Sequence, residues 1–177
     1  GNGNSVHDRY LAADGSPIAS KAGYAEIERV YNAQKKLVEE IYLNGEGQNA
    51  VNTVGVHRIH REYNLLGQKT RESYFDAKNL PCGSDNTFSS VLYAYDRNGN
   101  IVRETYLGAD EKPIANRAGY AEIVRVYSAQ KKLLEERYLD TDGNACPNTN
   151  GVHAILRSYN ALGQKITEQY LNVKDQA

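Results

Sequence analysis

Apolar and polar residues alternate along the chain in short runs, and these runs come in pairs. In the clearest pair, the runs 88–95 and 101–107 are separated by the polar stretch Asp96-Arg97-Asn98-Gly99-Asn100. Alternation with a period of two places successive side chains on opposite faces of a strand. Asn-Gly between two such runs is typical of a type I′ hairpin turn, in which both central residues have positive φ. The pattern therefore predicts antiparallel hairpins and an all-β chain.

The hairpin pattern recurs every 32 residues, as the spacing from Gly23 to Gly55 and from Gly119 to Gly151 shows. Two series of tyrosines keep the same phase. They are Tyr31, Tyr63, Tyr95, Tyr127 and Tyr159, and then Tyr42, Tyr74, Tyr106, Tyr138 and Tyr170. A lone hairpin is not stable in water, whereas stacked hairpins bury a continuous stripe. The period therefore predicts a tandem array that forms an elongated antiparallel sheet or a β-solenoid.

We expect a single repeat array over residues 1–177. Its units are a partial repeat at 1–22, followed by repeats at 23–54, 55–86, 87–118, 119–150 and 151–177. A longer period is superimposed, because Gly23–Leu43 and Gly119–Leu139 are identical at 17 of 21 positions. Three hairpin types, A, B and C, therefore form a block that is duplicated, in the order half-C, A, B, C, A, B. Asn2-Gly3-Asn4 aligns with Asn98-Gly99-Asn100, so we expect the chain to begin within a C-type turn.

The position of each turn predicts which residues face one another across a hairpin. Centring the turn on its two middle residues pairs Tyr31 with Val38, Arg29 with Glu40 and Ile27 with Tyr42, all on one face, which we call the regular face. The same register gives Arg61 with Glu72, Arg125 with Glu136, Arg157 with Glu168 and Tyr93 with Glu104. The opposite face is less regular, and we expect it to be mostly solvated. One of its positions is occupied by Glu26, Arg58, Ser90, Glu122 and Ala154.

The regular face has two possible interpretations. It could be the inner face of the array, where each cross-strand charge pair stabilises a hairpin. It could instead be a ligand surface, because repeated tyrosine rings and arginine side chains suit sugars and extended peptides. The candidate binding residues are then both tyrosine series together with Arg29, Arg61, Arg125 and Arg157.

Linkers of about eleven residues, rich in Gly, Asn, Asp and Pro, join the hairpins as loops should. One linker position stays small or apolar, and we expect it to tuck under the sheet. Its occupants are Ile18, Ala50, Cys82, Ile114 and Cys146. The two cysteines are too few for a disulfide framework, and we expect buried free thiols.

Composition and charge limit the partners. The chain has 14 Tyr, 2 Phe and no Trp, and its net charge is −1. Nucleic acids and anionic membrane surfaces both favour a basic protein, and no apolar run is long enough to span a membrane. We therefore expect no nucleic-acid partner and no membrane insertion.

Catalytic and metal-binding patterns are weak. His57 and His60 lie three residues apart on a predicted strand and face opposite ways, so they cannot chelate one ion. Asp140, Asp142 and Asn144 resemble a shortened calcium loop without its closing Glu, and we expect a polar turn there. No nucleophile–base constellation or phosphate-binding loop is present in the sequence. We expect no cofactor, no metal and no enzymatic activity.

Two short motifs carry a resemblance to known repeats. Tyr95-Asp96-Arg97-Asn98-Gly99-Asn100, and more loosely Tyr63-Asn64-Leu65-Leu66-Gly67-Gln68, resemble the core of tyrosine-aspartate (YD, or Rhs-type) repeats. The hairpin-plus-linker layout is also similar to choline- and glucan-binding cell-wall repeats.

The resemblance implies a non-catalytic module for binding or spacing within a larger bacterial surface or secreted protein. The implied location is extracellular or in the cell envelope, with a protein or a cell-wall glycan as partner. The alternative is a scaffold segment of a toxin or enzyme whose catalytic domain lies outside this chain. The sequence leaves the oligomeric state open.

Overall fold

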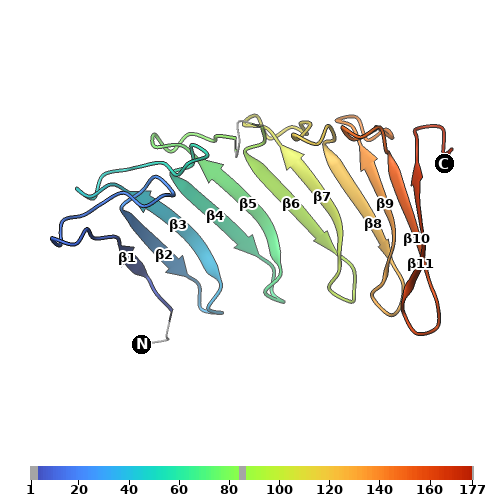
Figure 1. Ribbon diagram of the computed structural model, residues 1–177, viewed down its shortest axis with the longest axis horizontal. Helices are drawn as coiled ribbons and strands as arrows, with labels where there is room; N and C mark the ends of the chain where they lie inside the picture. Colours follow the sequence, from blue (N-terminus) through green and yellow to red (C-terminus); the bar gives the residue numbers. More distant parts are fainter. Residues whose placement is uncertain (1–3, 84–86, 177) are drawn as a thin grey trace. The chain divides into compact units, whose positions relative to one another are not determined.

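The computed structural model describes residues 4–83 and 87–176, and in these residues the chain is all-β. Eleven antiparallel strands form a sheet whose strand order is the order of the chain (Figure 1). The strands are β1 (His7–Arg9), β2 (Glu26–Tyr31), β3 (Leu37–Leu43), β4 (Arg58–Tyr63), β5 (Lys69–Phe75), β6 (Ser90–Tyr95), β7 (Ile101–Leu107), β8 (Glu122–Tyr127), β9 (Leu133–Leu139), β10 (Ala154–Tyr159) and β11 (Lys165–Leu171). The predicted fold class, a tandem array of hairpins in one antiparallel sheet, is confirmed. The described residues contain no helix that could cross a membrane.

The chain divides into two compact units, Gly1–Ser90 and Val91–Ala177. In the first unit β1 is the second strand of a C-type hairpin, β2–β3 is an A hairpin and β4–β5 is a B hairpin. In the second unit β6–β7 is the C hairpin, β8–β9 is the A hairpin and β10–β11 is the B hairpin. Ser90, the first residue of β6, is the last residue of the first unit. The turn predicted at Asn2-Gly3 lies outside the described residues.

The hairpin turns are not of the predicted type I′. In the C hairpin, Gly99 N donates to Asp96 O at 3.1 Å, and Asp96 Oδ1 accepts bonds from the backbone N–H groups of Asn98 and Asn100. Only the fourth residue of the turn, Gly99, has a positive φ, of 82°. This is the pattern of a type I turn followed by one left-handed residue. The equivalent residues of the other hairpins are Lys35, Gly67, Lys131 and Gly163.

The extra left-handed residue changes the register next to each turn. Ile27–Tyr42 and Arg29–Glu40 pair as predicted, but Tyr31 lies opposite Leu37 rather than Val38. The same shift occurs beside Tyr63, Tyr127 and Tyr159. The predicted Tyr31–Val38 pair is therefore wrong. The cause is a β-bulge, which sets two residues of one strand against one residue of its partner.

The linkers fold over one end of the regular face and form its apolar core. In the first unit Ile27, Tyr42 and Val56 are buried together. Tyr24 from the preceding linker stacks on Tyr42 with ring centroids 4.5 Å apart. Cys82 packs against the same cluster. The second unit repeats this arrangement with Ile123, Tyr138 and Ile155. Water is therefore excluded from the linker end of the two A hairpins, as in a packed core.

A buried histidine fixes a linker to the sheet in the first unit. His57 is 2% exposed, and its Nδ1–H lies 2.9 Å from both Tyr42 O and Ala50 O. A carbonyl oxygen can only accept, so Nδ1 carries the proton. His153 occupies the same repeat position and is 1% exposed, but its Nδ1 has no hydrogen-bond partner among the described residues, and its Nε2 lies 3.2 Å from Arg137 Nη1. The hydrogen bonds that fix the linker are therefore specific to His57.

The linker position expected to tuck under the sheet does so only in part. Cys82 and Cys146 contact the core clusters, but Ile18 is 50% exposed and Ile114 is 37% exposed. Cys82 Sγ rests 4.0 Å from Gly55 O in the preceding linker.

The face opposite the regular face is less solvated than predicted. Glu26 is 2% exposed, Ser90 1% and Ala154 0%. Glu26 is covered because Arg9 on the adjacent strand reaches it at 2.5 Å. Similar contacts between successive hairpins join Arg58 to Glu39 at 2.8 Å and Arg103 to Glu122 at 2.5 Å. The expectation of a solvated face is therefore wrong at this position.

The left-handed turn residue provides a test of the turn assignment. Lys35 has a φ of 60°, a conformation that strains a side chain bearing a Cβ atom. Lys35→Gly should raise the free energy of unfolding by about 0.5–1 kcal/mol, measured by urea denaturation. The control Lys36→Gly, at a neighbour without a positive φ, should be neutral or destabilising. Stabilisation by the control and not by Lys35→Gly would contradict the turn assignment.

Candidate binding surface

An alternating ladder of charged side chains crosses the middle of the regular face in the first unit. Arg29 contacts Asp8 of β1 at 2.5 Å and Glu40 of its own hairpin at 3.8 Å. Arg61 contacts Glu40 of the preceding hairpin and Glu72 of its own hairpin, both at 2.6 Å. Each arginine thus joins two hairpins. The predicted cross-strand pairs are confirmed, and the contact to the preceding hairpin is additional.

The second unit carries the same ladder. Arg125 pairs with Glu104 of the preceding hairpin and, at 3.0 Å, with Glu136 of its own. Arg157 pairs with Glu136 at 3.2 Å and with Glu168 at 2.7 Å. All five of these side chains are only 14–23% exposed. At such exposure, losing one partner costs more than it does at an open surface.

A lysine closes each ladder at the B hairpin. Lys69 contacts Glu72 at 3.0 Å, and Lys165 contacts Glu168 at 2.7 Å. The A and C hairpins have an apolar residue at this position, namely Leu37, Ile101 and Leu133. The C hairpin that follows B has Tyr93 where other hairpins have the ladder arginine. The lysine therefore supplies, from within the B hairpin, the cation that the next hairpin lacks.

Hydrogen bonds hold two acidic members of the ladder, Glu72 and Glu168, in their charged form. Burial alone would raise the pKa of Glu72, but hydrogen bonds from Tyr74, Arg61 and Lys69 outweigh it, so the pKa is lowered. The pKa of Glu168 falls to about 2, because Lys165, Tyr170 and Arg157 all donate to it. Glu72 and Glu168 are thus ionised throughout the neutral range.

The two tyrosine series lie at opposite ends of the strands. In the series that begins with Tyr42, the rings of Tyr42 and Tyr138 are 7% exposed beneath the linkers, whereas Tyr170 is 52% exposed. Burial raises the pKa of Tyr42 to about 12. In the series that begins with Tyr31, the half-buried rings lie near the turns. Tyr63 Oη donates to Leu37 O at 2.9 Å, and Tyr159 Oη donates to Leu133 O at 3.0 Å.

The predicted binding residues mostly have partners within the protein. Arg29, Arg61, Arg125 and Arg157 all use their guanidinium groups within the ladder. The structure therefore brings the predicted tyrosines and arginines together on one face, where they join successive hairpins. A ligand role for this set remains a prediction. Tyr159 alone also lines a groove, described below.

Other candidate chemistry has a structural explanation. Asp140 Oδ1 accepts bonds from Asp142 N and Asn144 N, so this carboxylate caps its own turn. Burial raises the thiol pKa of Cys82 and of Cys146, which disfavours a reactive thiolate. Within residues 4–83 and 87–176, no three His, Cys, Asp or Glu side chains gather in a way that could hold a metal ion.

The hairpin tips, defined as 32–36, 64–68, 96–100, 128–132 and 160–164, differ in charge from the whole chain. They contain five cationic residues, Lys35, Lys36, Arg97, Lys131 and Lys132, against the single acidic residue Asp96. Three leucines there are almost fully solvated: Leu65 at 95%, Leu66 at 83% and Leu162 at 84%. In each unit the tips lie at the strand ends away from the linkers (Figure 1). The tips are therefore basic, although the net charge of the whole chain is −1.

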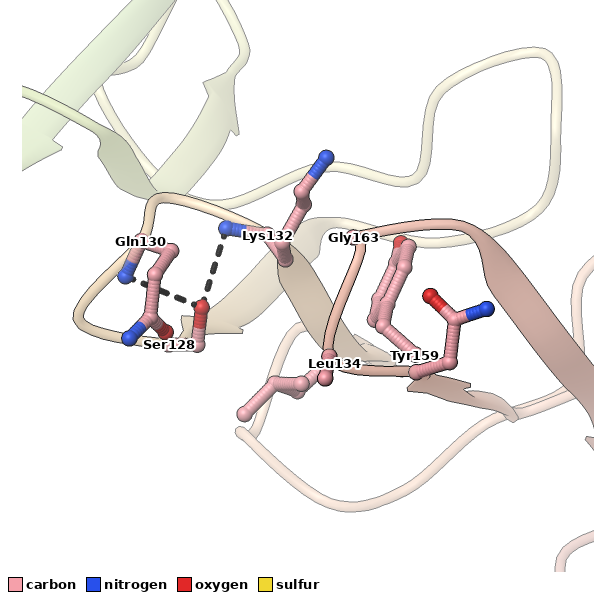
Figure 2. Close-up of a pocket in the computed structure, with 8 residues that line it drawn as sticks. Ser128, Gln130, Lys132, Leu134, Tyr159 and Gly163 are labelled. Carbon is pink, nitrogen blue, oxygen red and sulfur yellow. Dashed lines mark hydrogen bonds between the residues drawn. The ribbon is translucent and has the colours of Figure 1, made fainter.

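A groove of about 290 Å³ lies between the tips of the A and B hairpins in the second unit. Ser128, Gln130, Lys132 and Leu134 line it from the A hairpin, and Tyr159, Asn160, Ala161 and Gly163 line it from the B hairpin. Figure 2 shows Ser128, Gln130 and Lys132 of one tip on one side of the groove and Tyr159 and Gly163 of the next tip on the other, with the Ser128 hydroxyl bonded within its own turn. Lys132 Nζ lies 5.7 Å from the centroid of the Tyr159 ring.

Sequence reasoning assigned the groove residues other than Tyr159 to turns and strands and missed their common location. The available signal was Lys131-Lys132, which repeats Lys35-Lys36 at the same turn position. The groove itself depends on how neighbouring tips are spaced, which a repeat pattern does not specify.

Comparison with known proteins gives no family. No protein-family model matches the sequence, and no curated protein matches it either.

The ladder provides a second test. Arg125→Ala should lower the free energy of unfolding by about 3 kcal/mol, because Glu104 and Glu136 both lose a partner in a half-buried site. Arg103→Ala should cost less than about 1 kcal/mol, since Arg103 is 52% exposed. The measurement is thermal and urea unfolding. Equal, small shifts in the two variants would contradict a structural role for the ladder.

The lowered pKa of Glu72 predicts a dependence on pH. Its folded pKa is below the unfolded value near 4.5, so its contribution is complete above pH 4.5 and is lost as the pH falls further. The difference in melting temperature between the wild type and Glu72→Gln should therefore shrink as the pH falls from 5 to 3. For Glu168→Gln the loss should extend from 4.5 to about 2.

Glu62→Gln is the matched control, because Glu62 is exposed in the same hairpin as Glu72. Its melting temperature should follow that of the wild type at every pH. A constant difference between the wild type and Glu72→Gln down to pH 3 would contradict the lowered pKa.

Proposed function

We propose that the chain is a non-catalytic repeat module that binds a protein or a glycan within a larger surface or secreted protein. The observation that supports this most directly is the division of the hairpin into two ends. At one end linkers bury the apolar residues, while at the other end a basic, solvated surface contains a groove.

The ladder supports the non-catalytic part of the proposal. Its arginines and carboxylates recur from hairpin to hairpin and pair with one another, so each has a structural use. A catalytic acid or base needs a distinct environment that sets its pKa apart from that of similar groups. Repetition of one environment disfavours such a specialised site.

The groove supports binding over spacing alone. Ligand sites are concave, partly apolar, and carry a few polar groups that fix orientation. The groove has an apolar wall from Leu134 and Tyr159, and polar groups from Ser128, Gln130 and Asn160. A spacer needs no such cavity.

A binding screen tests the proposal. The chain should bind at least one member of a set of glycans, peptidoglycan fragments and surface-protein extracts, and mass spectrometry should recover that ligand unchanged after incubation. Gln130→Ala at the tip should weaken binding, whereas Asn49→Ala in a linker should not. Turnover of the ligand would contradict the non-catalytic part, and failure of every ligand would leave a spacer.

A further inference from the structure

We propose that the tip groove of the second unit is a subsite for an acidic sugar, such as a hexuronate residue of an anionic polysaccharide. This inference rests on the proposed binding function and names the ligand class. It follows from the unpaired lysine and the other side chains that line the groove, and from the size of the groove.

Lys132 provides the charge. It has no carboxylate within salt-bridge distance in residues 4–83 and 87–176, and it lies over the Tyr159 ring. Gly163 leaves room for it, because a Cβ atom there would approach Lys132 Cε to 3.0 Å. The ammonium is therefore directed along the groove by the neighbouring tip. A single unpaired cation in a groove favours an anionic group on the ligand.

The remaining lining residues suit the pyranose ring of an acidic sugar better than they suit other anionic ligands. The Tyr159 ring and Leu134 offer an apolar surface for the C–H face of a sugar, while the Gln130 amide and the Ser128 hydroxyl, which also line the groove, are groups that can bond to its hydroxyls. The volume of about 290 Å³ is near the lower end of known ligand pockets, roughly 300–1,000 Å³, and suits one or two rings.

Two alternatives fit less well. A phosphate prefers a row of backbone N–H groups or an arginine fork. Here the Gln130 and Lys132 N–H groups already bond to Ser128 Oγ at 3.2 Å. An extended peptide that adds a strand needs free backbone groups. At this tip Asn160 N already donates to Gln164 O at 3.0 Å.

The first unit offers an internal comparison. There Gln34 Nε2 donates to Leu65 O at 3.3 Å and bridges the two tips. Leu65 replaces Ala161, and Lys36 is exposed where Lys132 is half-buried. We therefore expect one subsite per chain, in the second unit, although both units have the same lysine pair.

The experiment is isothermal titration calorimetry of the full chain with hexamers of mannuronate, galacturonate and glucuronate, each compared with its own neutral methyl ester. We expect at least one acid to bind at one site per chain and at least 10-fold more tightly than its ester. Lys132→Gln should weaken binding at least 10-fold, and Gln130→Ala at least 3-fold.

Two lysine variants serve as matched controls. Lys131→Gln removes the same charge from the same tip but outside the groove lining, and Lys36→Gln removes the equivalent lysine of the first unit. Each should change the affinity less than 3-fold. Losses as large as that of Lys132→Gln would show diffuse attraction and overturn the proposal. Equal binding of acids and esters, or no binding of any acid, would also overturn it.

A vesicle arm separates this proposal from docking on lipid. The chain is mixed with phosphatidylglycerol vesicles, and Leu162→Ser is compared with the wild type. Vesicle binding that depends on Leu162, without saccharide binding, would assign the tips to a membrane surface and overturn the sugar subsite. If the screen instead yields a protein or neutral glycan whose binding Lys132→Gln leaves intact, the binding function stands and the acidic-sugar subsite fails.

Discussion

The repeat depends on an arginine that reaches back to the preceding hairpin. A hairpin alone is marginally stable, so each hairpin must gain stability from its neighbours. Arg61 makes this contact through ion pairs, because it pairs with Glu40 of the preceding hairpin and with Glu72 of its own hairpin. Because these side chains are mostly shielded from water, the attraction is stronger than that of an exposed pair, but an unpaired member would be costly.

That cost explains the arrangement of charges at the end of each ladder. Each ladder contains three acids and three cations, namely Asp8, Glu40, Glu72, Arg29, Arg61 and Lys69 in the first unit. Lys69 stands where the A and C hairpins have an apolar residue, and it pairs with Glu72 of its own hairpin. Each ladder is therefore neutral within its own unit.

The two ends of a hairpin have different physical tasks. At the linker end, His57 and the core around Tyr42 exclude water and fix the loops. At the tip end, side-chain caps such as Asp96 satisfy the turn backbone, so the remaining side chains need not pack. Those side chains are free to differ between units, and this freedom is what allows a groove to open beside Lys132 in one unit and a bridge from Gln34 to close the tips in the other.

The sequence by itself determined the period, the strands, and the pairing of Arg29 with Glu40, because alternation and a fixed repeat set which side chains share a face. The turn type and the pairing of Tyr31 could not be predicted, since Asn-Gly suits more than one turn and the left-handed residue adds a bulge. The burial of Glu26 and the groove at Lys132 were decided only by the tertiary structure. Both depend on contacts between successive hairpins, and a repeat pattern describes one hairpin without giving the spacing to the next.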